Sequence, residues 1–183
     1  MEKILNLYSQ LSKSYDLLYG GEQKKKYELL LRLKKPYGIV VDLGCGTGMF
    51  LEYIANLCTF VVGLDICREM IEMAKCRRGS NVDLVLGDMS LPPFRTTVFD
   101  FVYSISVLGD VIDHRVVPRI FSILKPNGVL VLTVLKTEST DLMIRSLIAE
   151  LSRLGFERIT LVNSPNTRDV IIMSRTMSDV KTL

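Results

Sequence analysis

Residues 40–48, VVDLGCGTG, place three glycines at alternate positions directly after a short hydrophobic run. A run of this kind, rich in β-branched residues, predicts a buried strand. Glycine lets the chain turn tightly after the strand and lets the backbone approach a ligand closely. In an open parallel sheet, ligands bind at the carboxyl ends of the strands. The segment therefore predicts a strand and a ligand-binding turn, followed by a helix.

Strand and helix patterns alternate along the chain beyond this segment. The strand patterns are almost continuously hydrophobic, which is typical of a parallel sheet covered by helices on both faces. The connection before the last strand is too short for a parallel crossover, so that strand is expected to run antiparallel to its neighbour. The expected fold is α/β, with a doubly wound and mostly parallel sheet of seven strands. These strands are expected at residues 38–44, 59–65, 81–88, 99–106, 129–135, 156–162 and 169–175.

The residues before the first strand predict two helices. Hydrophobic residues recur at the spacing of one helix face in the first, which is expected to end at Gly20-Gly21. The second is expected from residue 22 up to Pro36. The residues on the face of the first helix are Ile4, Tyr8, Leu11, Tyr15 and Leu18.

Length and composition indicate one domain. The 183 residues are 48% hydrophobic and 23% charged, enough for one sizeable core. We expect a single domain over 1–183, with residues 1–38 as a helical lid or substrate segment and 39–183 as the α/β core. The hydrophobic runs are strand-sized and no secretory signal is visible, so a cytoplasmic protein without a membrane span is expected. The cysteines form no CxxC pair, so we expect reduced thiols and no metal site; a Cys58–Cys76 disulfide stays open for a hyperthermophilic source.

Acidic residues close three of the predicted strands. Asp42 ends the first strand, Asp65 the second and Asp88 the third. With the first strand in the middle of the sheet, the three carboxylates are expected along one cleft. A single acid at a strand end more often caps a helix or faces solvent. The glycines are spaced GxGxG, and Met49 stands where a dinucleotide-binding GxGxxG motif has its third glycine, which argues against a nicotinamide or flavin cofactor.

Taken together, these motifs resemble the class I S-adenosylmethionine-dependent methyltransferases, and within them the small type 11-like family. The resemblance covers about residues 38–135 motif by motif. It implies a Rossmann-like sheet of order 3-2-1-4-5-7-6 with the last strand antiparallel, and N-terminal helices over the cofactor cleft. It also implies S-adenosylmethionine as the cofactor. The segments that carry it are VVDLGCGTG, GLDICREMIEMAK, GDMSLPPF, FDFVYSISVL and LKPNGVLVLT.

The resemblance also assigns cofactor contacts. The glycine turn lies under the methionine end of the cofactor, and Asp42 supports that turn and the ammonium group. Asp65 takes both ribose hydroxyls, and Asp88 accepts a hydrogen bond from the adenine amine. Ile66 and Met89 border the adenine. The expected cofactor-binding residues are Tyr15, Asp42, Gly44, Cys45, Gly46, Gly48, Asp65, Ile66, Asp88, Met89 and Ser104.

The reaction itself leaves few marks in the sequence. Methyl transfer from a sulfonium is an in-line displacement in which alignment supplies much of the rate, so a dedicated base is not required. The [DN]PP[YF] signature of enzymes that methylate exocyclic or amide nitrogens is absent, because SISV occupies its place. No Pro-Cys pair offers the nucleophile used for C5-pyrimidine methylation. Ring nitrogens, hydroxyls, carboxylates, thiols and carbon acids remain as acceptors.

A lid and a base are the remaining candidates on the acceptor side. Tyr15, Asp16 and Tyr19 resemble an N-terminal segment that closes over the cofactor in many relatives, although Tyr15 can equally pack its own helix. His114 is the only histidine and the natural candidate base at neutral pH. A lone histidine near a helix start more often faces solvent. The candidates for a catalytic role are Tyr19, Asp110 and His114.

The charge distribution bears on the acceptor. Residues 1–38 hold eight Lys/Arg against four Asp/Glu. This makes RNA, either tRNA or rRNA, or a translation-related molecule the favoured substrate, and the resemblance adds a small activator protein as a candidate partner. A small-molecule methyltransferase is the alternative, because the net charge is only +3. An NAD(P)-dependent reductase or a non-catalytic binding subunit is less favoured. A run of lysines on a helix is, however, more often a plain solvated face. The basic residues within 24–35 are Lys24, Lys25, Lys26, Arg32, Lys34 and Lys35.

Overall fold

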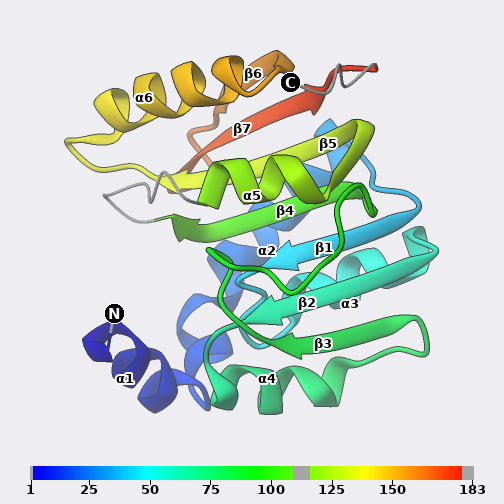
Figure 1. The fold of residues 1–183 in the computed structure, drawn as a ribbon. Coiled ribbons are helices and arrows are strands. Elements are labelled where there is room, and N and C mark those ends of the chain that lie inside the picture. The colour runs from blue at the N-terminus through cyan, green and yellow to red at the C-terminus, as the bar shows by residue number, and fades with distance from the viewer. Residues whose placement is uncertain (1, 109–115, 179–183) are drawn as a thin grey trace.

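The computed structural model describes residues 2–108 and 116–178. Within these ranges, seven strands form one sheet in the order β3-β2-β1-β4-β5-β7-β6 (Figure 1). Neighbouring strands from β3 to β5 are parallel, whereas β7 is antiparallel to both β5 and β6. The expected fold class and strand order are confirmed. The strands are β1 Ile39–Leu43, β2 Phe60–Asp65, β3 Val82–Leu86, β4 Phe99–Leu108, β5 Leu124–Leu135, β6 Phe156–Asn163 and β7 Asp169–Thr176.

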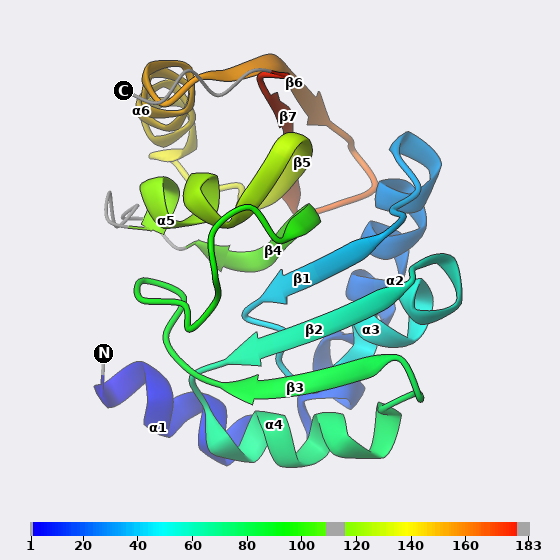
Figure 2. The same cartoon turned by 45° about the vertical axis from the view of Figure 1, so that its right-hand side comes forward.

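Helices cover both faces of the sheet, and each face has its own hydrophobic core. One core joins the sheet to α2, α3 and α4, and the other joins it to α5 and α6. Figure 2 shows these helical layers on opposite sides of the strands. The helices are α1 Glu2–Leu11, α2 Tyr15–Leu33, α3 Met49–Ile54, α4 Arg68–Ala74, α5 Val116–Ile123 and α6 Thr140–Arg153, with 3₁₀ turns Ala55–Leu57 and Lys75–Arg77.

The break between the two N-terminal helices differs from the prediction. α1 ends at Leu11, and α2 runs from Tyr15 through both glycines to Leu33. The hydroxyls of Ser12 and Ser14 donate to the carbonyls of Ser9 and Leu11, which lets these serines compete with regular helix bonding. A glycine inside a helix costs only about 1 kcal/mol relative to alanine, and packing of α2 on the sheet offsets that cost.

Lys26 fixes α2 to the sheet, which contradicts its expected place on a solvated basic face. Its side chain is 1% exposed, and its Nζ lies 2.8 Å from Asp169 Oδ2 at the start of β7. The same ammonium donates to the hydroxyl of Ser106 near the end of β4. Lysine is almost never buried unless it is paired, and this pair joins segments far apart in the sequence. Lys24 and Lys25 remain exposed.

Candidate cofactor site

The glycine loop lies between β1 and α3 at the carboxyl ends of the strands. Gly44, Gly46 and Gly48 have φ angles of +82°, +54° and +79°, which favour glycine. A Cβ on Gly44 would lie 2.3 Å from Cγ2 of Val107, and one on Gly48 would lie 3.0 Å from Cβ of Ala74. A Cβ on Gly46 would meet nothing within 4 Å. Two glycines of the loop therefore serve packing, whereas the third leaves open space beside bare backbone.

A small cavity of about 30 Å³ adjoins this loop. It brings together several of the predicted cofactor residues. Five lining residues were not predicted, because sequence pattern alone does not show which side chains around a loop face its cavity: Gln23, Tyr27, Thr47, Met49 and Ile105. The lining residues are Tyr15, Gln23, Tyr27, Asp42, Gly44, Cys45, Gly46, Thr47, Met49 and Ile105.

Asp42 brings a buried carboxyl group to the cavity. Its side chain is 2% exposed, and its Oδ1 accepts no hydrogen bond from any residue that the structure describes. Burial, and secondarily the charge of Asp65, raises the pKa of Asp42 to about 8. Burial, together with Asp42, also raises the pKa of the neighbouring Cys45 thiol well above its usual value. Asp42 is therefore a buried acceptor that a cationic donor would stabilise in its charged form.

Asp65 joins the end of β2 to the glycine loop. Its Oδ2 accepts from the Gly46 amide at 2.8 Å, and its Oδ1 accepts from the Cys67 amide at 2.8 Å. Burial raises the pKa of this half-buried carboxyl, although the two amide donors act in the opposite direction. Asp65 thus holds the loop in the structure as well as lying at its expected strand end.

The residues expected at the adenine follow β2 and β3. The Gly87 amide donates to the Asp65 carbonyl at 2.9 Å, which keeps these two strand ends together. Ile66 is 41% exposed. Asp88 Oδ1 accepts from the Ser90 amide at 2.7 Å, so this carboxylate also shapes its own turn.

The start of α2 is tied to the loop by charged and polar groups. The Thr47 hydroxyl donates to Asp16 Oδ1 at 2.6 Å, and Arg77 donates to Asp16 Oδ2 at 2.6 Å. A second guanidinium nitrogen of Arg77 donates to the Thr47 carbonyl at 2.8 Å. Asp16 therefore joins the start of α2 to the glycine loop. Arg77 could not be predicted, since its partners lie far away in the sequence.

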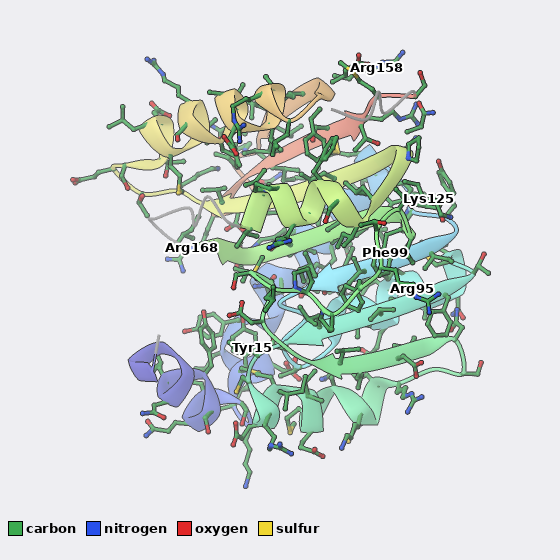
Figure 3. All side chains as sticks on the ribbon, in the orientation of Figure 1. Tyr15, Arg95, Phe99, Lys125, Arg158 and Arg168 are labelled. Atoms are coloured by element: carbon green, nitrogen blue, oxygen red, sulfur yellow. The ribbon has the colours of Figure 1, made fainter. Side chains whose placement is uncertain are left out.

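Aromatic rings extend this contact outward. Tyr15 packs against Tyr8 and Tyr19, with ring centroids 6.3 Å and 4.9 Å apart. Figure 3 shows Tyr15 beyond the arrowheads of the central strands, whereas Phe99 and Lys125 lie toward the opposite end of the sheet. Tyr15 lines the cavity, but Tyr19 does not. Burial raises the pKa of the Tyr15 phenol to about 12.

The end of β4 forms an irregular wall beside the loop. Its pairing with β5 shifts register between Ser104 and Leu108, and Ser106 has a φ of +58°. The Ser106 hydroxyl donates to Asp169 Oδ2 at 2.9 Å, and its amide donates to the Thr133 hydroxyl at 2.8 Å. This bulge places Val107 against Gly44. The buried pair of Lys26 and Asp169, described above, holds this bulge in place.

Three predicted site residues remain: one does not line the cavity and two lie outside the described residues. Ser104 is fully buried within β4 and does not line the cavity. Asp110 and His114 lie outside the described residues, as does Asp113.

Over residues 2–108 and 116–178, no cluster of His, Cys, Asp and Glu has a geometry suited to a metal ion. In the same ranges, none of the helices has the length and hydrophobicity needed to cross a membrane. The cysteines Cys45, Cys58, Cys67 and Cys76 are free thiols.

Known proteins match this chain over the region that forms the site. A family model described as a methyltransferase domain matches residues 41–132, from β1 to β5. A protein of Methanocaldococcus jannaschii is 32% identical over 79% of this chain and 57% of its own length. A trans-aconitate 2-methyltransferase of Variovorax paradoxus is 34% identical over 67% of this chain and 49% of its own length. An 18S rRNA (guanine-N(7))-methyltransferase of Bos taurus is 30% identical over 70% and 49%. The chain thus spans about half the length of these relatives.

Solved structures share the whole fold at low sequence identity. The complex of DhpI with SAH has a TM-score of 0.76 at 20% identity and covers 96% of both chains. A methyltransferase-like protein in complex with the Trm112 activator of Haloferax volcanii has a TM-score of 0.72 at 16% identity, covering 93% of this chain and 97% of that one. Because the family model covers about half of the chain, this protein belongs to the class I S-adenosylmethionine-dependent methyltransferases, whose cofactor is S-adenosylmethionine.

Proposed function

We propose that this protein binds S-adenosylmethionine at the glycine loop and transfers its methyl group to a nucleophile held near the N-terminal helices. The observation that carries the proposal is the cavity beside the loop, into which Asp42 brings a buried carboxylate. Since Oδ1 of this carboxylate accepts no hydrogen bond within the described part of the chain, it is free to receive a cationic donor. The methionine end of the cofactor carries such a donor.

The other loop residues fit the remaining parts of the cofactor. The open space at Gly46 gives the methionine end access to bare backbone. Asp65 accepts two amide hydrogen bonds in the structure, and a carboxylate offers about four acceptor positions, so it keeps capacity for the ribose hydroxyls. We assign Ile66, Asp88 and Met89, at the ends of β2 and β3, to the adenine.

The protein contributes mainly alignment and exclusion of water. When bound, S-adenosylmethionine supplies a methyl group that is already activated on a positively charged sulfur. We propose that residues 1–38 act as a lid on the core formed by residues 39–183, within a single domain. Because the raised pKa keeps Tyr15 protonated at neutral pH, its phenol offers a hydrogen-bond donor and an aromatic surface rather than a base. Alignment alone can supply an effective molarity of about 10⁵ M or more.

Binding measurements on matched aspartate variants test this proposal. In calorimetry, Asp65→Ala should weaken binding of S-adenosylmethionine and of its demethylated product by ~1–3 kcal/mol, because charge-assisted bonds to the diol are lost. Asp83→Ala removes an exposed carboxylate of β3 that pairs only with Arg78 among the described residues, so it should leave the affinity unchanged. Equal affinity of wild type and Asp65→Ala would show that the ribose lies elsewhere.

For the acceptor, we propose RNA. Exposed Lys24 and Lys25 on α2 support this assignment, and further cations surround an open hollow at the end of that helix. A helix of 19 residues is about 28 Å long, so RNA that contacts this hollow and the site must extend over a similar distance. Residues lining the hollow, of about 610 Å³, are Glu28, Leu31, Arg32, Leu33, Lys34 and Lys35.

A small anionic acceptor is the second candidate, and two observations favour it. Burial of Lys26 removes one cation from the basic face. Exposed Arg168 lies, like Tyr15, at the end of the sheet where the central strands finish (Figure 3). Incubation of cell extract with a methyl-labelled donor separates the two, since label enters either nuclease-sensitive RNA or the small-molecule fraction. Binding of the donor without any labelled product would instead support a non-catalytic subunit.

A small activator protein is the proposed partner. This proposal rests on the fold shared with the methyltransferase-like chain of the Haloferax volcanii complex. Co-expression with an activator homologue of the source organism should give a co-purifying complex with a higher rate of methyl transfer. A chain that is fully active alone and does not co-purify with the homologue would rule this out.

A further inference from the structure

Gln23 brings a second buried acceptor to the cavity at the glycine loop. This side chain is 6% exposed and projects from the buried face of α2, which it shares with Lys26, Tyr27 and Leu30. Its Oε1 accepts no hydrogen bond from any residue that the structure describes. A buried carbonyl oxygen left without a hydrogen bond costs about 1–3 kcal/mol. Such a cost is tolerated where a ligand supplies the missing donor.

The two unsatisfied acceptors share one small space. Gln23 and Asp42 both line the cavity of about 30 Å³, which has room for roughly one or two groups of the size of water. The nearest turn of α2 carries a cation, but the Lys26 ammonium is already held by Asp169 and Ser106. When Asp42 is charged, a donor for both oxygens must therefore come from a ligand or from solvent.

An ammonium group meets this demand better than water does. It has three N–H donors, so it can serve Gln23 and Asp42 together, and its positive charge compensates the buried carboxylate. Water offers two donors and no charge. We propose that Gln23 is a specificity residue that, with Asp42, selects ligands carrying a primary ammonium group at the methionine end. This inference rests on the proposed function, because the ligand concerned is the cofactor.

Ligands that differ in one group test the inference by calorimetry. The first is S-adenosylhomocysteine, the second is its deaminated 2-oxo analogue, and the third is 5′-methylthioadenosine, which lacks the amino acid end. Gln23→Met keeps the length of the side chain but removes the acceptor. We expect it to weaken S-adenosylhomocysteine about 10-fold or more, in line with a lost hydrogen bond to a charged group. The affinities for the other two ligands should change less than about twofold, because neither carries the ammonium.

Two further variants serve as controls. Gln23→Glu restores an acceptor at the same position and should bind S-adenosylhomocysteine at least as tightly as the wild type. Tyr37→Phe, at an exposed aromatic residue outside the cavity lining, should leave all three affinities unchanged. Thermal unfolding of each variant shows whether it is folded before binding is measured. If Gln23→Met does not fold, the Gln23→Glu variant and the wild-type preference for the aminated ligand still decide the question.

Each outcome has a separate meaning. Failure of the wild type to bind S-adenosylhomocysteine would overturn the proposed function. Tight binding by the wild type together with unchanged affinity in Gln23→Met would overturn only the role of Gln23. Equal weakening of all three ligands would show that Gln23 supports α2 and does not read the ammonium group. Equal affinity of the wild type for the aminated and deaminated ligands would show that water alone satisfies the two oxygens.

Discussion

Gly44 and Gly46 are two positions apart in one loop, yet their surroundings differ. Both have positive φ, which costs other residues about 1–2 kcal/mol. A Cβ on Gly44 would in addition collide with Val107, whereas one on Gly46 would enter open space. Gly44→Ala should therefore lower the free energy of unfolding by ~1–3 kcal/mol more than Gly46→Ala does. Chemical denaturation of the ligand-free protein measures this difference.

Cofactor binding should rank these two variants differently. Gly46→Ala fills the space that we assign to the methionine end, so it should remain folded and bind S-adenosylhomocysteine at least about 10-fold more weakly. A Gly46→Ala protein that binds like the wild type would move the ligand away from this side of the loop. Equal stabilities of the two variants would show that Val107 moves aside at little cost.

The buried carboxyl of Asp42 predicts a pH dependence of stability. Its pKa is about 8 in the folded protein and 3.8 as the usual value, so the folded state holds the proton more tightly. Protonated Asp42 therefore stabilises the folded state most below the unfolded pKa. This stabilisation is lost as pH rises to about 8. Asp42→Asn should therefore stabilise the ligand-free protein at pH 9 by at least ~1 kcal/mol, or about 2–4 °C in Tm.

Melting curves from pH 5 to pH 9 provide the measurement. The difference in Tm between Asp42→Asn and the wild type should widen as pH rises. The affinity for S-adenosylhomocysteine should be lower in the variant than in the wild type. Asp83→Asn, at an exposed carboxylate, is the control and should leave the gap constant. A gap that stays constant for Asp42→Asn as well would mean that Asp42 is charged and compensated without ligand.

At the scale of single residues, the sequence predicted the features that follow from local pattern, namely the strand ends and the glycine turn. Asp42 and Asp65 could be placed at one edge because each ends a hydrophobic run, and parallel strands end together. The hydrogen bonds of Asp65 to two amides could not be predicted, because they depend on the shape of the loop. Gln23 was missed because a glutamine next to lysines indicates a solvated helix face until its helix is docked.

The helix α2 passes through two glycines whose costs differ. Gly21 is exposed and a Cβ there would meet nothing within 4 Å, whereas a Cβ on Gly20 would lie 3.4 Å from Cε of Met49. Gly21→Ala should stabilise the protein by about 0.5–1 kcal/mol through helix propensity. Gly20→Ala should gain less, because the Met49 side chain must adjust. Urea denaturation of both variants measures the gain, and no gain for Gly21→Ala would argue that this turn is not helical in solution.

The buried pair of Lys26 and Asp169 should behave as a unit. Lys26→Met leaves the carboxylate buried without its cation and should cost ~3–5 kcal/mol. The double variant Lys26→Met with Asp169→Asn should cost much less than the sum of the single variants, since neither partner is left charged. Denaturant unfolding gives the coupling energy. Additive effects would show that the two groups do not interact in solution.

Element by element, the periodicity of the sequence was a good guide except near the N-terminus. All seven strands and the antiparallel β7 were predicted from hydrophobic runs and connection lengths. The end of the first helix was misplaced at Gly20-Gly21, because the packing that overrides two glycines is tertiary. Lys26 was assigned to solvent for the same reason, since its partner on β7 cannot be recognised from local pattern.

For the whole molecule, ligand binding should couple the lid to the core. S-adenosylhomocysteine at about 100 times its Kd should add ~2.7 kcal/mol of stability, or about 5–10 °C in Tm. Hydrogen exchange should slow in the first turns of α2, where Tyr15 and Asp16 contact the loop. NADPH at the same concentration is the control and should cause neither change. Stabilisation by NADPH alone would contradict the assignment of the cofactor.

The salt bridge between α2 and β7 also sets an order of events during synthesis. Lys26 leaves the ribosome early, but Asp169, its buried partner, is translated only after six of the seven strands. Until then, the one acidic partner of Lys26 among the described residues is the nearby Glu22 of its own helix, at 3.5 Å. We therefore expect the wall that α2 gives to the glycine loop to form only after the C-terminal hairpin has emerged, and the donor ligand to bind only then.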